Sequence, residues 1–182
     1  MQRVVIIGPC GAGKSTLSFT LARQLGLPLY HMDQLNWMPG WVDGGNDRVR
    51  AKLGEILPQD HWLIEGNYGS TLPGRLDRAD TIVYLDFPIP LCLWRIVKRV
   101  VTMRGRTRPD MTEDCPERLD LEFLWYVATW RLGPGPRTDR ALAAHRAKVI
   151  HLTSPRSVER WLASLPARPE CGVEGDRDAL AG

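Results

Sequence analysis

Residues 8–15, with the sequence GPCGAGKS, match the phosphate-loop (Walker A) pattern G-x-x-x-x-G-K-[ST] at every fixed position. They follow a short β-branched run at residues 4–7, and from residue 14 apolar residues recur at helical spacing until Gly26. A strand, a glycine-rich turn and a helix in this order are the context in which the pattern binds phosphate. These flanking elements disfavour the alternative of a glycine turn that only resembles the pattern. A strand, a phosphate loop and a helix are therefore predicted over the first 26 residues.

The chemistry expected at this loop is the binding of ATP with Mg²⁺. Glycines let successive backbone N–H groups turn toward the β-phosphate, and the helix N-terminus adds donors and a partial positive charge. Lys14 would reach the β- and γ-phosphates, and the Ser15 hydroxyl would bind Mg²⁺. The residues predicted to bind the nucleotide are Gly8, Gly11, Ala12, Gly13, Lys14, Ser15 and Thr16.

Strands and helices alternate along the rest of the chain. Further strands are predicted at residues 28–32, 62–65, 81–86 and 148–152. Helices are predicted from Asn46 as a cap to residue 57, at 91–104, at 116–132 up to a breaker at 133–136, and from a Ser154 cap to 165. This alternation predicts an α/β fold with a doubly wound parallel sheet and helices on both faces.

Length and composition predict one soluble globular domain. The chain has 182 residues, of which 43% are hydrophobic and 25% charged, and its formal net charge is +3. We expect a domain at 1–165 and a disordered tail at 166–182, where apolar residues are few. No apolar run reaches the roughly 18 residues of a membrane helix, and no signal peptide precedes the first strand, so a cytoplasmic location is expected. The four cysteines form no CxxC pair, which indicates neither disulfides nor a zinc site.

A second acidic residue is needed to hold the magnesium ion, and two carboxylates are candidates. Glu65 ends the strand predicted at 62–65, so its side chain would stand at the edge where ligands bind in such sheets. Asp86 ends the next predicted strand, but the prolines at 88 and 90 suggest that it begins a turn. Glu65 is favoured and Asp86 is the alternative. Either could instead be a capping or solvated carboxylate.

A basic segment follows the strand at 81–86. Arg95, Lys98 and Arg99 lie on one helix side. Arg104, Arg106 and Arg108 then crowd into a stretch with too many helix breakers for a regular helix. A mobile arginine-rich lid at about 104–116 fits this pattern, because arginines that close over a transferring phosphoryl group stabilise its charge and exclude water. A solvated basic helix is the alternative, and a nucleic-acid groove is a weaker one.

The chain resembles the adenylate-kinase-like and shikimate-kinase-like small P-loop kinases over roughly residues 1–165. The resemblance implies a three-layer P-loop NTPase fold with a five-stranded parallel sheet in the order 2-3-1-4-5. The residues at 31–37, 39–41, 64–68, 85–88 and 104–115 look like those of the bacterial topology-modulation or FlaR-type proteins. Glu65 and Gly66 match the acid-glycine pair of adenylate kinases, but Asn67 and Tyr68 depart from the Phe-Pro-Arg that follows there.

The resemblance also implies an acceptor site at about 33–60, over the phosphate loop. In shikimate-type kinases an aspartate orients the acceptor hydroxyl and receives its proton, a role that would fall to Asp33. Asp33 could instead only form a turn. Trp37, Trp41 and Tyr68 could stack on a base or cover a sugar, or the tryptophans could simply pack in the hydrophobic core. Arg75 would either grip an acceptor anion or pair with Asp77 or Asp80 at the surface. The residues predicted to contact the acceptor are Asp33, Trp37, Trp41, Asn67, Tyr68 and Arg75.

We therefore expect a small kinase that transfers the γ-phosphoryl group of ATP·Mg to a nucleotide or another small molecule. The expected catalytic residues are Lys14, Asp33, Arg104, Arg106 and Arg108, and the metal ligands are Ser15 and Glu65. A regulatory NTPase, possibly DNA-associated, is the alternative, although the chain has no helix-turn-helix signature. A plain ATPase is the third hypothesis. The sequence leaves open the acceptor, the preferred nucleoside triphosphate and the oligomeric state.

Overall fold

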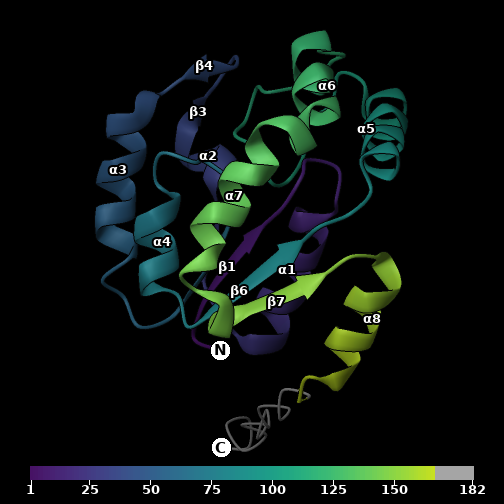
Figure 1. Ribbon diagram of the computed structural model, residues 1–182. Coiled ribbons are helices and arrows are strands. Elements are labelled where there is room, and N and C mark those ends of the chain that lie inside the picture. Colours follow the sequence, from purple (N-terminus) through teal and green to yellow (C-terminus); the bar gives the residue numbers. More distant parts are fainter. Residues whose placement is uncertain (167–182) are drawn as a thin grey trace, which may run out of the picture.

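Five parallel strands form the central sheet of the computed structural model, which describes residues 1–166 (Figure 1). Across the sheet they are β2 (Leu29–His31), β5 (Trp62–Glu65), β1 (Arg3–Ile7), β6 (Thr81–Leu85) and β7 (Val149–Leu152). Counted along the chain among these five, the order is 2-3-1-4-5, which confirms the prediction. The tail predicted to be disordered lies, from residue 167 on, outside the described residues.

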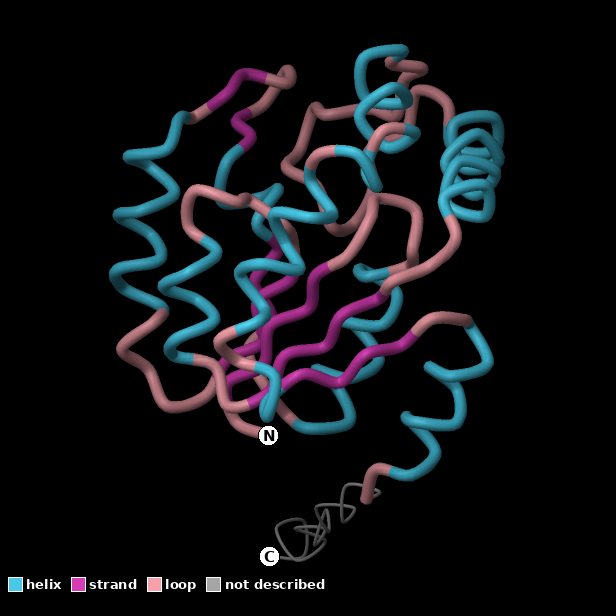
Figure 2. The backbone as a smooth tube through the Cα atoms, in the orientation of Figure 1, coloured by secondary structure: helices cyan, strands magenta, loops and turns pink. Residues whose placement is uncertain are grey.

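Side chains of each strand alternate between two hydrophobic cores, one on each face of the sheet. In β1, Val4 and Ile6 belong to one core and Val5 and Ile7 to the other, and all four are fully buried. Helices α1 (Lys14–Leu25), α5 (Ile89–Met103), α6 (Leu121–Ala128) and α8 (Pro155–Ser164) cover the first core. Helices α3 (Gly45–Ile56), α4 (Leu72–Arg78) and α7 (Pro134–Ala143) cover the second. The three layers are visible in Figure 2.

Two predicted helix ends are confirmed by their capping geometry. Helix α1 ends at Leu25 and is capped by Gly26, which has a left-handed φ of 67°. Helix α8 begins after Ser154, whose side chain accepts a hydrogen bond from the Ser157 N–H at 3.2 Å, and the Ser157 hydroxyl accepts one from the Ser154 N–H. Within residues 1–166, every helix is too short or too polar to cross a lipid bilayer.

Several predicted boundaries are wrong. Helix α3 begins at Gly45 rather than after Asn46, whose side chain instead accepts a hydrogen bond from the Ser70 hydroxyl. The helix predicted at 116–132 is shorter: α6 is capped by Asp120 and followed by the 3₁₀ turn η1 (Trp130–Leu132). The glycine-proline breaker at 133–136 begins α7, because proline in a first helical turn loses no helical hydrogen bond.

A short antiparallel hairpin after β2 was not predicted. Helix α2 (Met32–Asn36) leads into β3 (Trp37–Met38), which pairs with β4 (Val42–Asp43). In Figure 1 the strands of the main sheet point toward the end of the molecule where α2, this hairpin and α6 lie. The remaining 3₁₀ turn, η2 (Arg146–Lys148), precedes β7. The carboxyl edge of the sheet, where ligands bind in such folds, is thus surrounded by the hairpin and the segment before α6.

Candidate active site

The phosphate loop, residues 8–15, joins the carboxyl end of β1 to the first turn of α1. A Cβ atom on Gly8, where φ is 143°, would lie 2.2 Å from the carbonyl oxygen of Leu85 at the end of β6. On Gly11, where φ is 83°, it would lie 2.4 Å from the carbonyl oxygen of Cys92 in α5. Only glycine allows both the left-handed conformation and this close approach of backbone to backbone. The loop is therefore packed tightly between β6 and α5.

Two side chains stabilise the loop, one from the loop itself and one from the segment after β5. Lys14 is 8% exposed, and its ammonium group donates to the carbonyl of Pro9 at 3.2 Å. Asn67 forms two hydrogen bonds to the backbone of Gly8: its Oδ1 accepts from the amide at 3.0 Å, and its Nδ2 donates to the carbonyl at 2.9 Å. The amide of Asn67, predicted to contact the acceptor, is thus engaged in positioning the phosphate loop, although the residue also lines the cleft.

A buried acid stands beside the loop at Glu65. Parallel pairing of β2 with β5 places His31 opposite Glu65, and the two side chains meet with Nδ1 2.9 Å from Oε2. The same Oε2 lies 3.3 Å from the Ser15 hydroxyl. Both His31 and Glu65 are buried. The carboxylate predicted to serve the metal is therefore next to the predicted Ser15 ligand.

Asp86, the alternative to Glu65, is engaged elsewhere. One of its oxygens lies 2.7 Å from the guanidinium of Arg131, and the other 3.1 Å from Nε2 of His151. Asp86 does not line the cleft that contains the phosphate loop. Between the two candidates, the geometry favours Glu65.

Asp33 projects from α2 into the same region. The hydroxyl of Tyr68 donates to Asp33 Oδ1 at 3.0 Å. Burial raises the pKa of Asp33, and the negative charge of Glu65 raises it further. Burial and the charge of Asp33 likewise raise the pKa of Tyr68. The result is a carboxyl group that is more basic than usual and held in a fixed position by a phenol.

Aromatic side chains from the β3–β4 hairpin form one wall of the cleft. The rings of Trp37 and Trp41 meet edge to face, with centroids 5.4 Å apart. The indole N–H of Trp41 donates to the carbonyl of Pro116 at 3.1 Å, and the guanidinium of Arg118 lies 5.4 Å from its ring centre. The wall is thus held by the segment that precedes α6.

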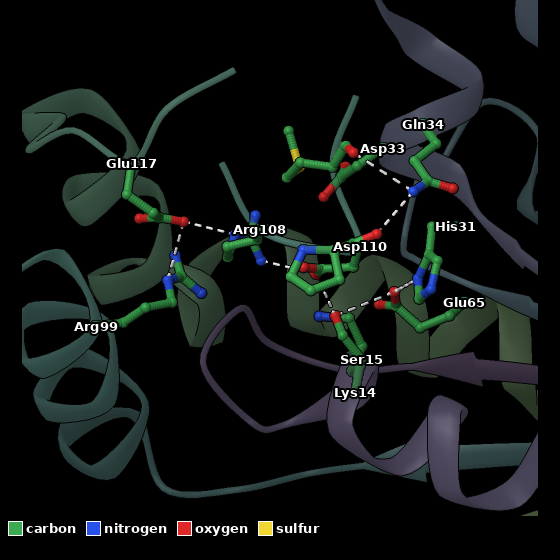
Figure 3. A network of polar contacts seen from close by, with 12 residues as sticks. Lys14, Ser15, His31, Asp33, Gln34, Glu65, Arg99, Arg108, Asp110 and Glu117 are labelled. Atoms are coloured by element: carbon green, nitrogen blue, oxygen red, sulfur yellow. Dashed lines mark hydrogen bonds and ion pairs between the residues drawn. The ribbon is translucent and has the colours of Figure 1, made fainter. Parts of the chain in front are cut away.

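That segment also carries an ion-pair network, shown in Figure 3. Arg108 lies between two acids, 2.8 Å from Asp110 and 2.6 Å from Glu117. Glu117 also pairs with Arg99 of α5 at 3.1 Å. Asp110 accepts a hydrogen bond from the Ser15 hydroxyl at 2.6 Å. The lid segment therefore contacts the phosphate loop through Asp110 and orients Arg108 toward the cleft.

The three arginines predicted to act together are separated. Arg108 lines the cleft, whereas Arg104 and Arg106 are exposed and do not line it. The backbone turns at Gly105, where φ is 74°, and the isolated bridge between Arg104 and Glu117 fixes the base of the lid. This position does not support the predicted catalytic role of Arg104 and Arg106. Asp110, which sequence reasoning did not identify, lies within the predicted lid two residues after Arg108.

Arg75 is fully buried and does not line the cleft. Its guanidinium donates to the carbonyls of Gly66 at 2.6 Å and Tyr68 at 3.1 Å, and also to that of Asn67. Burial lowers its pKa to about 9. Both expectations for Arg75, an acceptor contact and a surface ion pair, are wrong. The residue instead holds the loop that presents Asn67 and Tyr68.

The phosphate loop, the acids Glu65 and Asp33, the hairpin tryptophans and Arg108 share one cleft of about 1410 Å³. This volume exceeds the roughly 300–1,000 Å³ of a typical site for one small molecule, so the cleft has room for a nucleotide and a second ligand. The predicted residues that line it are Gly11, Ala12, Gly13, Lys14, Ser15, Thr16, Asp33, Trp37, Trp41, Glu65, Asn67, Tyr68 and Arg108. Among residues 1–166, no group of three or more His, Cys, Asp or Glu side chains could hold a metal ion by itself.

Comparison with known sequences identifies relatives that are kinases. Shikimate kinase 1 of Citrobacter koseri and Shikimate kinase 1 of Escherichia fergusonii are each 30% identical to the chain over 138 residues. These matches span 68% of this chain and 76% of each relative. No family model matches the chain.

Solved structures share the fold. A shikimate kinase from Bacteroides thetaiotaomicron superposes with a TM-score of 0.53 and 16% identity, covering 89% of this chain and 94% of that one. A shikimate kinase from Acinetobacter baumannii, solved in complex with shikimate, gives a TM-score of 0.53 and 17% identity, covering 89% and 91%. At these identities the likeness establishes the architecture of the sheet and its helices.

Proposed function

Since this chain belongs to the shikimate kinase family of phosphotransferases, we propose that it transfers the γ-phosphoryl group of ATP to a hydroxyl group of a small molecule bound beside Asp33. The observation that carries this proposal is the shared cleft. It brings the phosphate loop with Lys14, the Ser15–Glu65 pair and the Asp33–Tyr68 pair together. Phosphoryl transfer needs little more from a protein than this positioning and charge stabilisation.

The nucleotide would bind with its phosphates at the N-terminus of α1. The loop amides and the helix dipole supply positive potential there. Lys14 is largely buried at that point, so its charge would act on the phosphates through little intervening water.

The residues beside Ser15 fit a magnesium ion. Mg²⁺ prefers oxygen ligands and commonly takes only one or two carboxylates, with phosphates and water completing its shell. The Ser15 hydroxyl and Glu65 carboxylate supply such oxygens at the loop, and His31 holds Glu65 in place. When bound, Mg²⁺ neutralises charge that develops on the phosphates. Ser15 and Glu65 are the residues that would hold it.

The acceptor would bind on the side of α2 and the β3–β4 hairpin. Asp33 would accept a hydrogen bond from the reacting hydroxyl and take up its proton, and its raised pKa makes it a better proton acceptor. Tyr68 fixes the carboxyl orientation. The indole rings of Trp37 and Trp41 would cover the apolar face of the acceptor.

The segment at 104–116 would act as a lid over the acceptor-binding insertion at about 33–60. Three hydrogen bonds join the lid to this insertion and support its placement over the acceptor. Gln34 donates to the carbonyl of Pro109 at 3.0 Å, Thr112 to that of Trp37 at 2.7 Å, and Trp41 to that of Pro116 at 3.1 Å. The lid would bring Arg108 to the transferring phosphoryl group, where a cation stabilises the charge of the transition state.

Shikimate is the first acceptor to test, because the relatives are named for it and one structural neighbour was solved with it. A hydroxylated acid would find cationic partners in the cleft among Arg108, Arg118 and Arg137. Membership of the topology-modulation or FlaR-type group is a finer proposal, which rests on the residues at 31–37, 64–68 and 104–115.

The experiment is an acceptor screen with ATP and Mg²⁺ against shikimate, other hydroxylated acids, sugars, nucleosides and nucleoside monophosphates. Release of ADP above the acceptor-free rate is expected for one class. The signal should disappear in Asp33→Asn and persist in Asp60→Asn, which changes an exposed carboxylate that does not line the cleft. Equal background hydrolysis with every class would instead support a regulatory NTPase.

A further inference from the structure

Two carboxylates converge on the Ser15 hydroxyl from different parts of the chain. Asp110 Oδ2 lies 2.6 Å from Ser15 Oγ, and Glu65 Oε2 lies 3.3 Å from it. A hydroxyl has one hydrogen to donate, so one of these two acids can receive it fully at any moment. The two carboxylate oxygens and the hydroxyl oxygen that they approach are the kind of ligand that a hard cation prefers.

Neighbouring side chains hold both the backbone around Asp110 and its carboxylate in place. Gln34 Nε2 donates to the carbonyls of Pro109 at 3.0 Å and Met111 at 3.4 Å, which ties the backbone around Asp110 to α2. Arg108 contacts the same Oδ2 atom that faces Ser15, at 2.8 Å. Asp110 is only 6% exposed. Its carboxylate is therefore built into the site.

We propose that Asp110 is a lid-borne ligand of the Mg²⁺ ion that accompanies the nucleotide. This inference rests on the proposed function and extends it. A carboxylate this close to the phosphate loop would repel the γ-phosphate, and a divalent cation between them converts that repulsion into attraction. The metal would then join the lid at 104–116 to the phosphate loop. Lid closure becomes dependent on metal-loaded nucleotide, which protects the bound ATP from hydrolysis before the site is complete.

The opposite role for Asp110 is a latch that occupies the phosphate site and must leave when ATP binds. The two roles predict opposite effects of removing the charge. As a metal ligand, Asp110 strengthens the binding of metal and nucleotide. As a latch, it weakens nucleotide binding.

The test uses Mn²⁺ as the probe, with an ATP analogue whose β,γ bridge resists hydrolysis. Electron paramagnetic resonance measures Mn²⁺ bound to the full chain at a fixed analogue concentration. Asp110→Asn is expected to weaken Mn²⁺ binding about tenfold or more, the scale of losses at metal sites. Asp110→Glu should retain more affinity than Asp110→Asn. Glu113→Gln, which changes an exposed acid of the same lid, should match the wild type.

A second readout follows the lid itself. Arg104 and Arg106 are exposed trypsin sites in the lid. Mn²⁺ with the analogue should slow cleavage at these sites in the wild type and much less in Asp110→Asn. Thermal unfolding of the two proteins without ligand checks that both are folded.

The outcomes separate this inference from the proposed function. Failure of the wild type to bind Mn²⁺ with the analogue would overturn both. Wild-type binding that Asp110→Asn leaves unchanged would overturn the role of Asp110 alone. Tighter analogue binding by Asp110→Asn would establish the latch and contradict the metal ligand.

Discussion

Tyr68 donates its phenolic hydrogen to Oδ1 of Asp33 across 3.0 Å, joining the loop after β5 to helix α2. Tyr68 has a positive φ of 36°, which is uncommon for a residue other than glycine. Its carbonyl is held by the buried guanidinium of Arg75. A residue in the core thus fixes the backbone from which Tyr68 reaches Asp33, and the proposed acceptor site depends on both contacts.

Replacement of Asp33 by Asn should reduce activity and increase stability. Loss of a general base lowers kcat by about 10²- to 10⁴-fold. Because the pKa of Asp33 is raised in the folded protein, ionisation opposes folding. The ionised Asp33 carboxylate destabilises the folded protein. This effect is absent below the pKa that Asp33 has in the unfolded chain, and it reaches its full value above the pKa that Asp33 has in the folded protein. Thermal unfolding should therefore show Asp33→Asn more stable than wild type at neutral pH, with the difference disappearing in acid. A variant less stable at neutral pH would contradict this.

Replacement of Tyr68 by Phe should shift the pH dependence of activity. The hydrogen bond from Tyr68 lowers the pKa of Asp33 against the larger effect of burial. Without the bond, protonation of Asp33 becomes easier, so the acid limb of the kcat/KM profile should move to higher pH. Rate measurements from pH 5 upward test this. A profile that only drops in height, with its acid limb unmoved, would show that Tyr68 does not act through Asp33.

Replacement of Arg75 by Met should destabilise the fold. Three backbone carbonyls would lose their donor inside the core, at a cost of roughly 3 kcal/mol or more. Denaturant unfolding should show a lower midpoint than wild type. An unchanged midpoint together with a raised KM for the acceptor would restore the acceptor-binding role that the buried position argues against.

Replacement of lid arginines should distinguish Arg108 from its neighbours. Arg108→Met removes the cation that lines the cleft and should lower kcat about 10²-fold or more, the scale seen when one donor to a transition state is lost. Arg106→Met removes an exposed cation of the same segment and should leave kcat near the wild-type value. Equal losses in both variants would point to the charge of the whole lid rather than to one guanidinium.

The strands and the phosphate loop could be predicted because their signals are local, whereas the strand order was implied by the resemblance to a known family. The β-branched run before Gly8 and the fixed positions of the loop motif describe neighbouring residues. The same holds for the Ser154 cap, whose partner Ser157 lies three residues away. Glu65 could be placed beside the loop because parallel strands end at one edge of the sheet.

The remaining site residues depend on contacts between distant parts of the chain. Asp110 meets Ser15 across 95 residues, and no local pattern encodes that contact. Arg75 resembles any surface arginine of a short helix, and only the fold reveals that it is buried. The β3–β4 hairpin has two residues in each strand, too few to give an alternating pattern.

Transfer of radiolabel from [γ-³²P]ATP tests the central claim most directly. With Mg²⁺ and shikimate, or the acceptor that the screen identifies, the wild type should produce a phosphorylated acceptor. Lys14→Ala should produce almost none, because Lys14 supplies the main positive charge inside the phosphate loop. Label that appears only as inorganic phosphate, or equal transfer by Lys14→Ala, would contradict the account.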